Sequence, residues 1–302
     1  MPAPLLSQGL PLPSLSSVSV LDHSILFSVD SLPASSKRIK TLALGGTSFY
    51  GLTLSGLYFL WYKEGLSPQF RFFNDNAQWK QIDKVGHFYS AYHFSRASAE
   101  AFRWAGLPQK KAMFWGAMAG VMLLTPIEIL DGFSPEYGAS WGDFVANTSG
   151  SAFLWGQALL WNEIRLKPKF SFRRTAYAPQ RPNVLGNGWQ EEWLKDYNGQ
   201  TYWLSVDVDK FLPKSRFPKW LNLALGYGAE NMLYARDDEN ESLGGLRAYR
   251  QYYLAPDWDL TALQPRRKFY KVLLFLLETV RLPGPALEYN RANGWQWHWL
   301  YF

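Results

Sequence analysis

Apolar residues follow two different patterns along the chain. In the first half they form three long stretches, residues 41–62 and 144–161 without a charge and residues 112–130 with Glu128 as the sole charge. About 20 apolar residues in a helix can cross a hydrocarbon core ~30 Å thick. Each stretch is therefore predicted to be helical. For residues 41–62 a membrane-crossing helix and a buried core helix are both compatible with the pattern.

Another helix is expected from residue 83 to residue 104, between the apolar stretches at residues 41–62 and 112–130. It is amphipathic, with charged side chains near its end. The third helix, near residues 112–130, is predicted to end at a left-handed glycine cap at Gly132. The last helix is predicted to begin near Ser140 and end near residues 162–165. Four helices with three apolar segments indicate a compact bundle.

From Lys167 onward the period changes to two, which is typical of strands. Large and small or polar residues alternate over residues 202–208, 221–228 and 295–302, and two shorter candidates cover 249–255 and 286–289. Residues 269–280 form an apolar helix flanked by basic residues, suited to an interface. Five or six strands are too few for a spanning barrel, which begins at eight.

The expected fold class is therefore α+β. A bundle of about four apolar helices precedes a strand-rich half that forms a partial antiparallel sheet or an incomplete barrel. We divide the chain into a disordered leader or signal remnant (1–38), the helical bundle (39–165) and the strand-rich, aromatic-rich region (166–302). The leader assignment rests on its Ser, Pro and Leu content and on the lack of Lys or Arg before Lys37, which does not fit an ordinary secretory signal.

Composition narrows the class of protein further. Aromatic residues make up 17% of the chain, and such rings collect where one end is apolar and the other wet. The net charge of +6 is dispersed, so nucleic-acid binding is disfavoured and membrane lipid is the expected partner, with other envelope proteins as further partners. The chain has no cysteine, which excludes disulfides, thiol nucleophiles and acylation of a cysteine within it.

Ionisable side chains recur inside or at the ends of the predicted helices. Burying such groups costs several kcal/mol each unless they are paired, so we expect them to meet. A surplus of carboxylates over lysine would suit a divalent metal, although no cofactor is specified by the sequence. His87 and Glu128 are the candidates for catalysis by metal-assisted hydrolysis. The polar cluster or ligand site comprises Asp83, Lys84, His87, Glu128, Asp131, Asp143 and Asn147, with metal-ligand candidates Asp83, His87, Glu128, Asp131 and Asp143.

A structural interpretation competes with this one. Asp83 has the position of a helix cap, and Ser140 with Asp143 has the spacing of a capping box. Glu128 and His87 stand where no cap is needed. We expect His93 to lie on a second face of the same helix as His87, and His298 to be a sheet residue; neither has an acidic partner in an obvious register.

The order Asp-Lys-x-x-His-Phe, Glu-x-x-Asp-Gly and Ser-Trp-x-Asp, with a later Gly, resembles the YfiM-like family of predicted periplasmic lipoproteins, a domain of unknown function. More remotely the chain is similar to VanZ-like membrane proteins, and its second half resembles long Bacteroidetes-type members of the family. The likeness covers roughly residues 80–160. The residues that carry it are Asp83, Lys84, His87, Phe88, Glu128, Asp131, Gly132, Ser140, Trp141, Asp143 and Gly150.

The resemblance implies a location in the bacterial cell envelope, at the outer membrane or the periplasmic face, and no particular reaction. Without a cysteine, either the apolar helices and sheet anchor the chain or the lipoprotein label does not apply to it. Our first hypothesis is a structural or accessory envelope protein, with no cavity beside the polar cluster. The alternatives are a metal-dependent hydrolase or lipid-modifying enzyme, with a pocket reaching His87 and Glu128, and a small transporter, with a continuous polar path.

Overall fold

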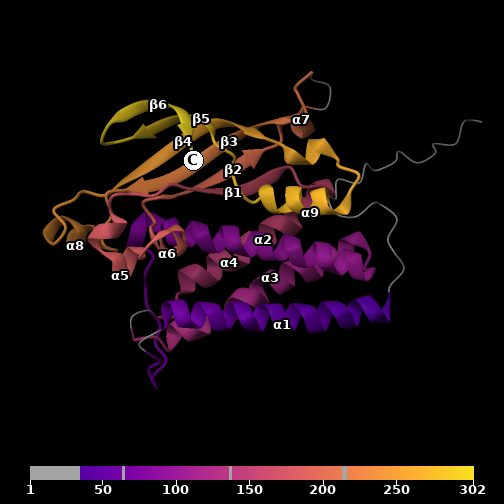
Figure 1. The fold of residues 1–302 in the computed structure, drawn as a ribbon, viewed down its shortest axis with the longest axis horizontal. Coiled ribbons are helices and arrows are strands. Elements are labelled where there is room, and N and C mark those ends of the chain that lie inside the picture. Colours follow the sequence, from indigo (N-terminus) through magenta and orange to yellow (C-terminus); the bar gives the residue numbers. More distant parts are fainter. Residues whose placement is uncertain (1–34, 63–64, 136–137, 213–215) are drawn as a thin grey trace, which may run out of the picture.

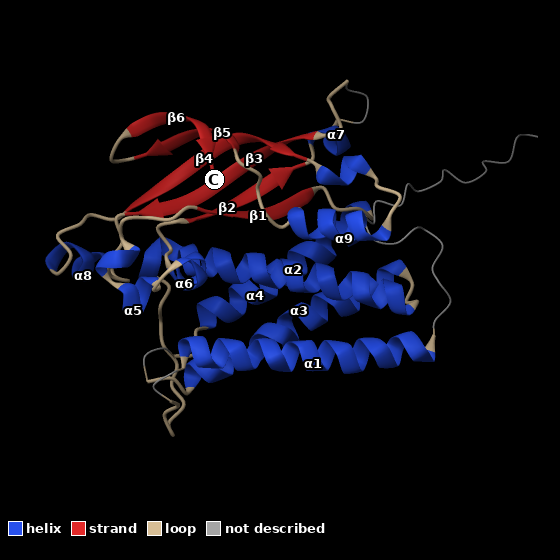
Figure 2. Cartoon of the chain, in the orientation of Figure 1, coloured by secondary structure: helices blue, strands red, loops and turns tan. Residues whose placement is uncertain are grey.

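The computed structural model describes residues 35–62, 65–135, 138–212 and 216–302 (Figure 1). The expected leader, residues 1–38, therefore lies almost entirely outside the described residues. The chain is α+β, as predicted: long helices come first and an antiparallel sheet follows. In Figure 2 the sheet forms one layer, α2 lies directly beneath it, and α1 lies on the far side of α3 and α4.

Four long helices occupy the predicted positions, within a few residues at each end. Their bounds are α1 Ser36–Trp61, α2 Ile82–Ala105, α3 Gln109–Gly132 and α4 Trp141–Trp161, with a short 3₁₀ turn, η1 Gln78–Gln81, before α2. The helix α4 begins at the expected cap, because the Ser140 side chain accepts a hydrogen bond from the Asp143 amide. Helix α2 packs against both α3 and α4.

Small residues permit this close packing. A Cβ added at Gly120 would lie 1.9 Å from Ser95 Oγ, and one at Gly150 would lie 2.1 Å from the backbone oxygen of Phe88. Glycine at these positions lets α3 and α4 approach α2. By contrast, nothing lies within 4 Å of a Cβ added at Gly51 or Gly56 of α1. Helix α1 is held more loosely, and its outer face exposes large apolar side chains such as Phe49 and Leu52.

The prediction of a left-handed cap at Gly132 was wrong. Gly132 is the last residue of α3, and the backbone continues into Phe133 in a right-handed conformation. The glycine is needed for space instead: an added Cβ would lie 2.1 Å from the ring of Phe70. The segment before α2 thus crosses the end of α3 at close range.

Six antiparallel strands follow in simple order, each paired with the next. They are β1 Leu166–Phe172, β2 Gln200–Val206, β3 Leu221–Glu230, β4 Tyr249–Trp258, β5 Gly284–Asn290 and β6 Gly294–Tyr301. The sequence pattern predicted β2 to β6. It did not predict β1, because the run Lys167, Pro168 and Lys169 contains none of the apolar residues that usually mark a strand.

Shorter helices lie at the margins of the sheet. The predicted apolar helix near residues 269–280 is α9, Lys268–Leu277, which ends earlier than expected because residues 279–281 pair with β1. The remaining elements were not predicted, since each is only one or two turns long: η2 Ala178–Gln180, α5 Pro182–Leu185, α6 Trp189–Lys195, α7 Val208–Phe211, α8 Asp237–Ser242 and η3 Leu260–Leu263.

Buried ion pairs join the bundle to the sheet. Lys167 of β1 lies 2.8 Å from both Asp259 and Glu278, and Arg96 of α2 donates to the same Glu278 carboxylate. All four side chains are buried. Removing one partner of such a group leaves an uncompensated buried charge, so the network fixes how α2 lies on β1.

One described helix, α3, is long and apolar enough to cross a membrane by length and composition. Only 28% of its most apolar 18-residue window is buried. The same criterion is met by some core helices of soluble proteins. The length and composition of α3 therefore do not distinguish a core helix from a membrane helix.

We predict that Gly150→Ala destabilises the protein by ~1–3 kcal/mol, because the new methyl group meets the backbone of α2 and cannot be accommodated by a side-chain rotation. The free energy of unfolding, from chemical denaturation, measures the effect. The control is Gly51→Ala, where the site is open; here alanine should stabilise the helix by ~0.5–1 kcal/mol. Equal effects at both positions would contradict the proposed role of Gly150.

Candidate functional site

The polar groups expected to meet come from three helices. Asp83, Lys84 and His87 lie in the first turns of α2, and Asp83 and His87 share one face at i and i+4. Asp143 and Asn147 lie one turn apart at the start of α4, facing α2. Glu128 lies near the end of α3 and is buried. The close packing of the three helices therefore brings these side chains together.

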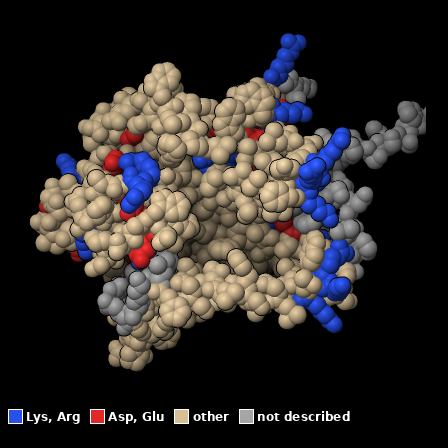
Figure 3. All heavy atoms as spheres, viewed as in Figure 1, with Lys and Arg blue, Asp and Glu red and all other residues tan. Residues whose placement is uncertain are grey.

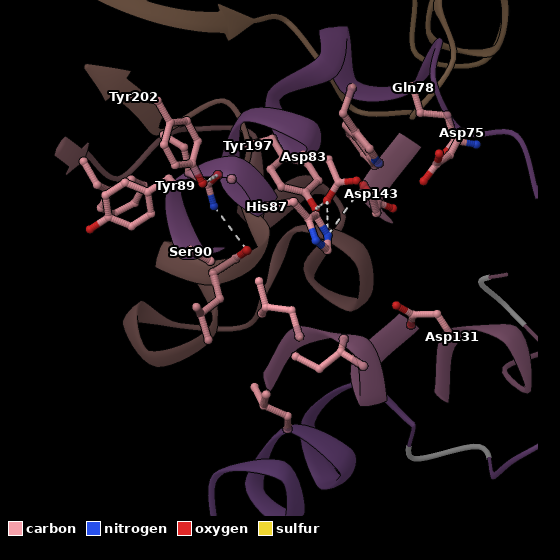
Figure 4. Close-up of a pocket in the computed structure, with 18 of the residues that line it drawn as sticks. Asp75, Gln78, Asp83, His87, Tyr89, Ser90, Asp131, Asp143, Tyr197 and Tyr202 are labelled. Atoms are coloured by element: carbon pink, nitrogen blue, oxygen red, sulfur yellow. Dashed lines mark hydrogen bonds and ion pairs between the residues drawn. The ribbon is translucent and has the colours of Figure 1, made fainter. Parts of the chain in front are cut away.

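His87 is at the centre of the group, with a different set of partners for each ring nitrogen. Figure 4 shows it beside Asp83 and Asp143. Its Nε2 lies 3.8 Å from Asp83 Oδ1 and 3.7 Å from Asp143 Oδ1. Its Nδ1 lies 3.1 Å from Asn147 Oδ1 and 3.3 Å from Glu128 Oε1. Asn147 in turn donates to Glu128 Oε1 at 3.0 Å. Asn147 and Glu128 thus fix the orientation of the imidazole, and Nε2 points toward two carboxylates.

Lys84 bridges a third carboxylate that the sequence analysis did not select. Its Nζ lies 2.6 Å from Asp75 Oδ2, 2.7 Å from Asp143 Oδ1 and 3.0 Å from Asp83 Oδ2. Asp75 also accepts a hydrogen bond from the Ser140 hydroxyl. In the sequence Asp75 lies between two asparagines, a pattern typical of a turn. No spacing rule links a loop residue to helices that begin several residues later.

Asp131 is separate from this group. It follows Glu128 by three residues, but its carboxylate accepts a hydrogen bond from the Tyr62 hydroxyl at 2.7 Å, next to the end of α1. In Figure 4 it lies across the pocket from Asp83, His87 and Asp143. Asp83 has its own tyrosine partner, because Tyr197 after α6 donates to its Oδ1 at 2.8 Å.

A cavity of about 680 Å³ separates Asp131 from the other acids. On the face shown in Figure 3 the surface is hollowed between α1 and α2, two of the helices that line it. Asp83, His87 and Asp143 reach its wall; Glu128 is not among the lining residues. Most of the remaining wall is apolar or aromatic, and includes Leu54, Leu57, Tyr89, Leu124, Ile127, Leu130, Phe170, Tyr202 and Val280.

Together, burial and the charges of neighbouring groups raise the pKa values of His87, Glu128 and Asp143. Burial opposes the charged form of His87, but Asp83, Asp143 and Glu128 outweigh it and raise the pKa of His87 to about 9. Burial raises the pKa of Glu128 to about 8 and, together with the charge of Asp83, that of Asp143 to about 7.

Two further acids behave differently from each other. Burial raises the pKa of Asp131 to about 6, although the Tyr62 hydrogen bond works against this. Burial also acts on Asp83, but His87 and Lys84 outweigh it and lower the pKa of Asp83 below its usual value. The lowered pKa keeps Asp83 ionised throughout the neutral range.

The arrangement fits a metal ion. One ligand atom each from Asp83, His87 and Asp143 lie within 4.8 Å of one another. An ion placed between these atoms would lie on the order of half their separation, or slightly more, from each of them. That distance is near the 2.0–2.6 Å at which divalent cations bind their ligands. A metal-bound histidine usually directs its other nitrogen to a carboxylate, as His87 does toward Glu128. The buried Glu128 Oε2 has no hydrogen-bond partner within the described ranges.

Two further histidines of the described residues, His93 and His298, lie elsewhere. His93, one face round on α2, donates from Nε2 to the Pro168 carbonyl at 2.8 Å, and burial lowers its pKa to about 3. The expectation that His298 lacks an acidic partner was wrong, because its Nε2 lies 2.7 Å from Glu288 Oε2 on the neighbouring strand β5. The pairing depends on the β5–β6 register, which includes an irregularity near Gly284 and Ala286 that the sequence did not reveal.

We predict that the free energy of unfolding of the metal-free protein falls by roughly 5 kcal/mol between pH 6 and pH 9. The folded state holds protons on His87 and Glu128 that the unfolded chain has already released, so stability is lost as pH rises through the folded-state values. Glu128→Gln should flatten the fall below pH 8. Urea denaturation at several pH values measures the free energy of unfolding. The exposed Asp237→Asn is the control, and it should keep the same dependence of this free energy on pH. A flat profile for the unmodified protein would contradict the prediction.

Comparison with known proteins agrees with the resemblance noted from the motifs. Residues 71–159 match the model of a family described as "Predicted periplasmic lipoprotein (DUF2279)". No curated protein and no solved structure matches the chain. The match supports the expected location in the cell envelope, and it does not bear on the longer form or on the VanZ-like likeness. Asp75, Asp83, His87, Glu128, Asp131 and Asp143 thus all lie in the segment that is similar to the DUF2279 family of predicted periplasmic lipoproteins.

Proposed function

We propose that this protein is an accessory protein of the bacterial cell envelope that binds a divalent cation between Asp83, His87 and Asp143. Through the open side of that ion it holds the anionic headgroup of an amphiphilic molecule, whose apolar part occupies the cavity. One observation carries the proposal: the three ligand atoms lie together at the wall of a largely apolar cavity.

The charge balance of the group favours a doubly charged ion. Asp75, Asp83 and Asp143 oppose one cationic side chain, Lys84, when His87 is neutral. Two negative charges are then left over, and a divalent ion would neutralise them. Without metal, the proton on His87 offsets one of the two charges. Metal binding therefore displaces that proton, which makes the affinity for the ion rise with pH.

The cavity supports an amphiphile as the bound molecule. A site with three protein ligands keeps a coordination position open, and here all three ligand residues line the cavity. Farther from the metal ligands the wall consists of leucines and aromatic rings, which suit an acyl chain rather than a sugar or a nucleotide.

We predict that the purified protein binds one Zn²⁺ or Mn²⁺ ion, measured by isothermal titration and by elemental analysis. Asp83→Asn and Asp143→Asn should each weaken binding at least a hundredfold, because each removes a charged ligand. Glu128→Gln should weaken it 10- to 100-fold, since it orients His87 without reaching the ion.

Asp131→Asn is the matched control. It removes a carboxylate from the same cavity but not from the three-ligand set, so the affinity should change less than threefold. Equal losses for Asp131 and Asp83 would indicate a diffuse acidic effect. If the ligand variants lower only thermal stability, and the unmodified protein takes up no metal, the cluster is a structural polar knot.

A second function, metal-assisted hydrolysis, is favoured by Asp131. Sequence reasoning named His87 or Glu128 as the general base, but His87 is occupied as a ligand and Glu128 does not line the cavity. Asp131 does line it, and burial raises its pKa to about 6, close to neutral. In this scheme Asp131 would take a proton from a water held beside the ion.

We therefore predict that, if the metal-loaded protein hydrolyses a phosphate or acyl ester of a long-chain lipid, Asp131→Asn lowers kcat at least a hundredfold while metal affinity is kept. Product release from fluorescent lipid analogues measures kcat. Full activity in the Asp131→Asn variant would exclude Asp131 as the base. No turnover by the metal-loaded unmodified protein would leave the binding function as the better account.

A further inference from the structure

The sheet has its polar and apolar faces reversed relative to a soluble protein. One face is buried and combines an apolar cluster around Trp203 and Tyr253 with many polar and charged side chains, among them Lys167, Lys169, Ser205, Asn222, Gln251, Asp257, Glu288 and Asn290. The opposite face of β3 to β6 is exposed and carries leucine, tyrosine and tryptophan. In water both faces would be unfavourable, since soluble sheets bury the apolar side.

Many side chains of the buried face pair with one another, although Asn222 Oδ1 and Asp257 Oδ1 have no hydrogen-bond partner among the described residues. Lys169 lies 2.6 Å from Asp257, which also accepts a hydrogen bond from Ser205 at 2.6 Å. The sheet curves enough for Thr201 of β2 to hydrogen bond with Tyr301 of β6 at 2.9 Å, although three strands separate them in the sheet order. The curvature encloses the polar groups and leaves the apolar outer face open to contact with an environment other than water.

The strand register arranges the outer face in rows across the sheet. One row is entirely aromatic and runs through Phe170, Tyr202, Tyr227, Tyr252, Tyr289 and Trp295. Two residues along, the next row runs through Pro168, Leu204, Leu225, Leu254, Leu287 and Trp297. The part of each row on β1 and β2 is covered by α2 and its neighbours, and so is Tyr227 of β3, whereas Leu225 of β3 and the exposed residues of the rows on β4 to β6 are not covered.

A second aromatic group closes the face at its other end. Trp258 stacks on Trp220, with ring centroids 5.3 Å apart, beyond the aliphatic rows. From Tyr252 to Trp258 the strand advances six residues, or about 20 Å at ~3.4 Å per residue. Lipid-facing sheets have an apolar band ~25 Å tall between two aromatic girdles. The outer face has the same order of side chains and nearly the same height.

Basic residues gather at the end of the face where Trp258 lies. Lys219 directly precedes Trp220, and Arg266, Arg267 and Lys268 lie shortly after β4, at the start of α9. In Figure 3, Lys and Arg gather mainly at the end of the molecule where α9 and the beginning of α1 are found. Cationic side chains next to an aromatic girdle are complementary to anionic lipid headgroups.

We propose that the outer face of β3 to β6 lies against the acyl chains of a lipid bilayer, with the Trp220–Trp258 end at the headgroups. This surface is distinct from the cation site and does not depend on the proposed function. A second copy of the chain or a protein partner would not require aliphatic rows bounded by aromatic rows, nor basic residues at one end.

The absence of cysteine allows a direct test with single-cysteine variants of the full chain. Nitroxide labels at Leu254→Cys and Trp297→Cys report on the outer face, where Leu254 is 43% and Trp297 is 52% exposed. Leu243→Cys, after α8 and 67% exposed, is the control away from the face. The protein is placed in phosphatidylcholine–phosphatidylglycerol vesicles, and relaxation by oxygen, which is lipid-soluble, is compared with relaxation by a water-soluble nickel chelate.

We expect oxygen to dominate at least threefold at the two outer-face labels and the chelate to dominate at the control. Access of the chelate to all three labels would overturn the proposal. Shielding of the outer-face labels from both reagents would overturn it too, because it indicates a protein–protein surface. As a second measurement, Leu254→Asp should lower binding to the same vesicles at least tenfold, and Leu243→Asp should leave it unchanged; equal binding of both variants counts against lipid contact.

Discussion

The structure depends on the neutralisation of charged groups that are held away from water along α2. This helix carries Asp83, Lys84 and His87 at its start and Arg96 farther along, and both groups are at least half-buried. Each must meet counter-charges from other elements, because an unpaired buried charge costs several kcal/mol. Asp143 and Glu128 serve this purpose on the bundle side, and Glu278 serves it on the sheet side.

These pairings place the cavity. Because α2 is tied to α4 on one side and to β1 on the other, its first turns form a wall shared by the bundle and the sheet. The third wall comes from α1 and the end of α3, where Tyr62 and Asp131 meet. The polar groups thus lie at one part of an otherwise apolar space, which is the arrangement that an amphiphilic ligand with a charged head requires.

The same constraint acts in the sheet in a different form. Its enclosed face contains paired charges and hydrogen-bonded amides, and its free face contains leucines and aromatic rings. A soluble protein gains most of its stability by the opposite arrangement. The proposed contact with lipid would remove the cost of the exposed apolar face, and in both halves of the chain buried charges meet partners in the interior.

Periodicity and the cost of burying charge are local or pairwise properties. They were enough to predict the α+β class, the four long helices, five of the six strands found in the described residues, and the convergence of Asp83, His87, Glu128 and Asp143. The folded arrangement was needed to see that Asp75 joins them, that Asp131 lies across a cavity, and that His298 pairs with Glu288. These depend on strand register and on how a loop crosses a helix end. Neither strand register nor a loop crossing produces a periodic pattern in the sequence. The pattern did not predict β1, because its lysines meet their acidic partners only in the folded chain.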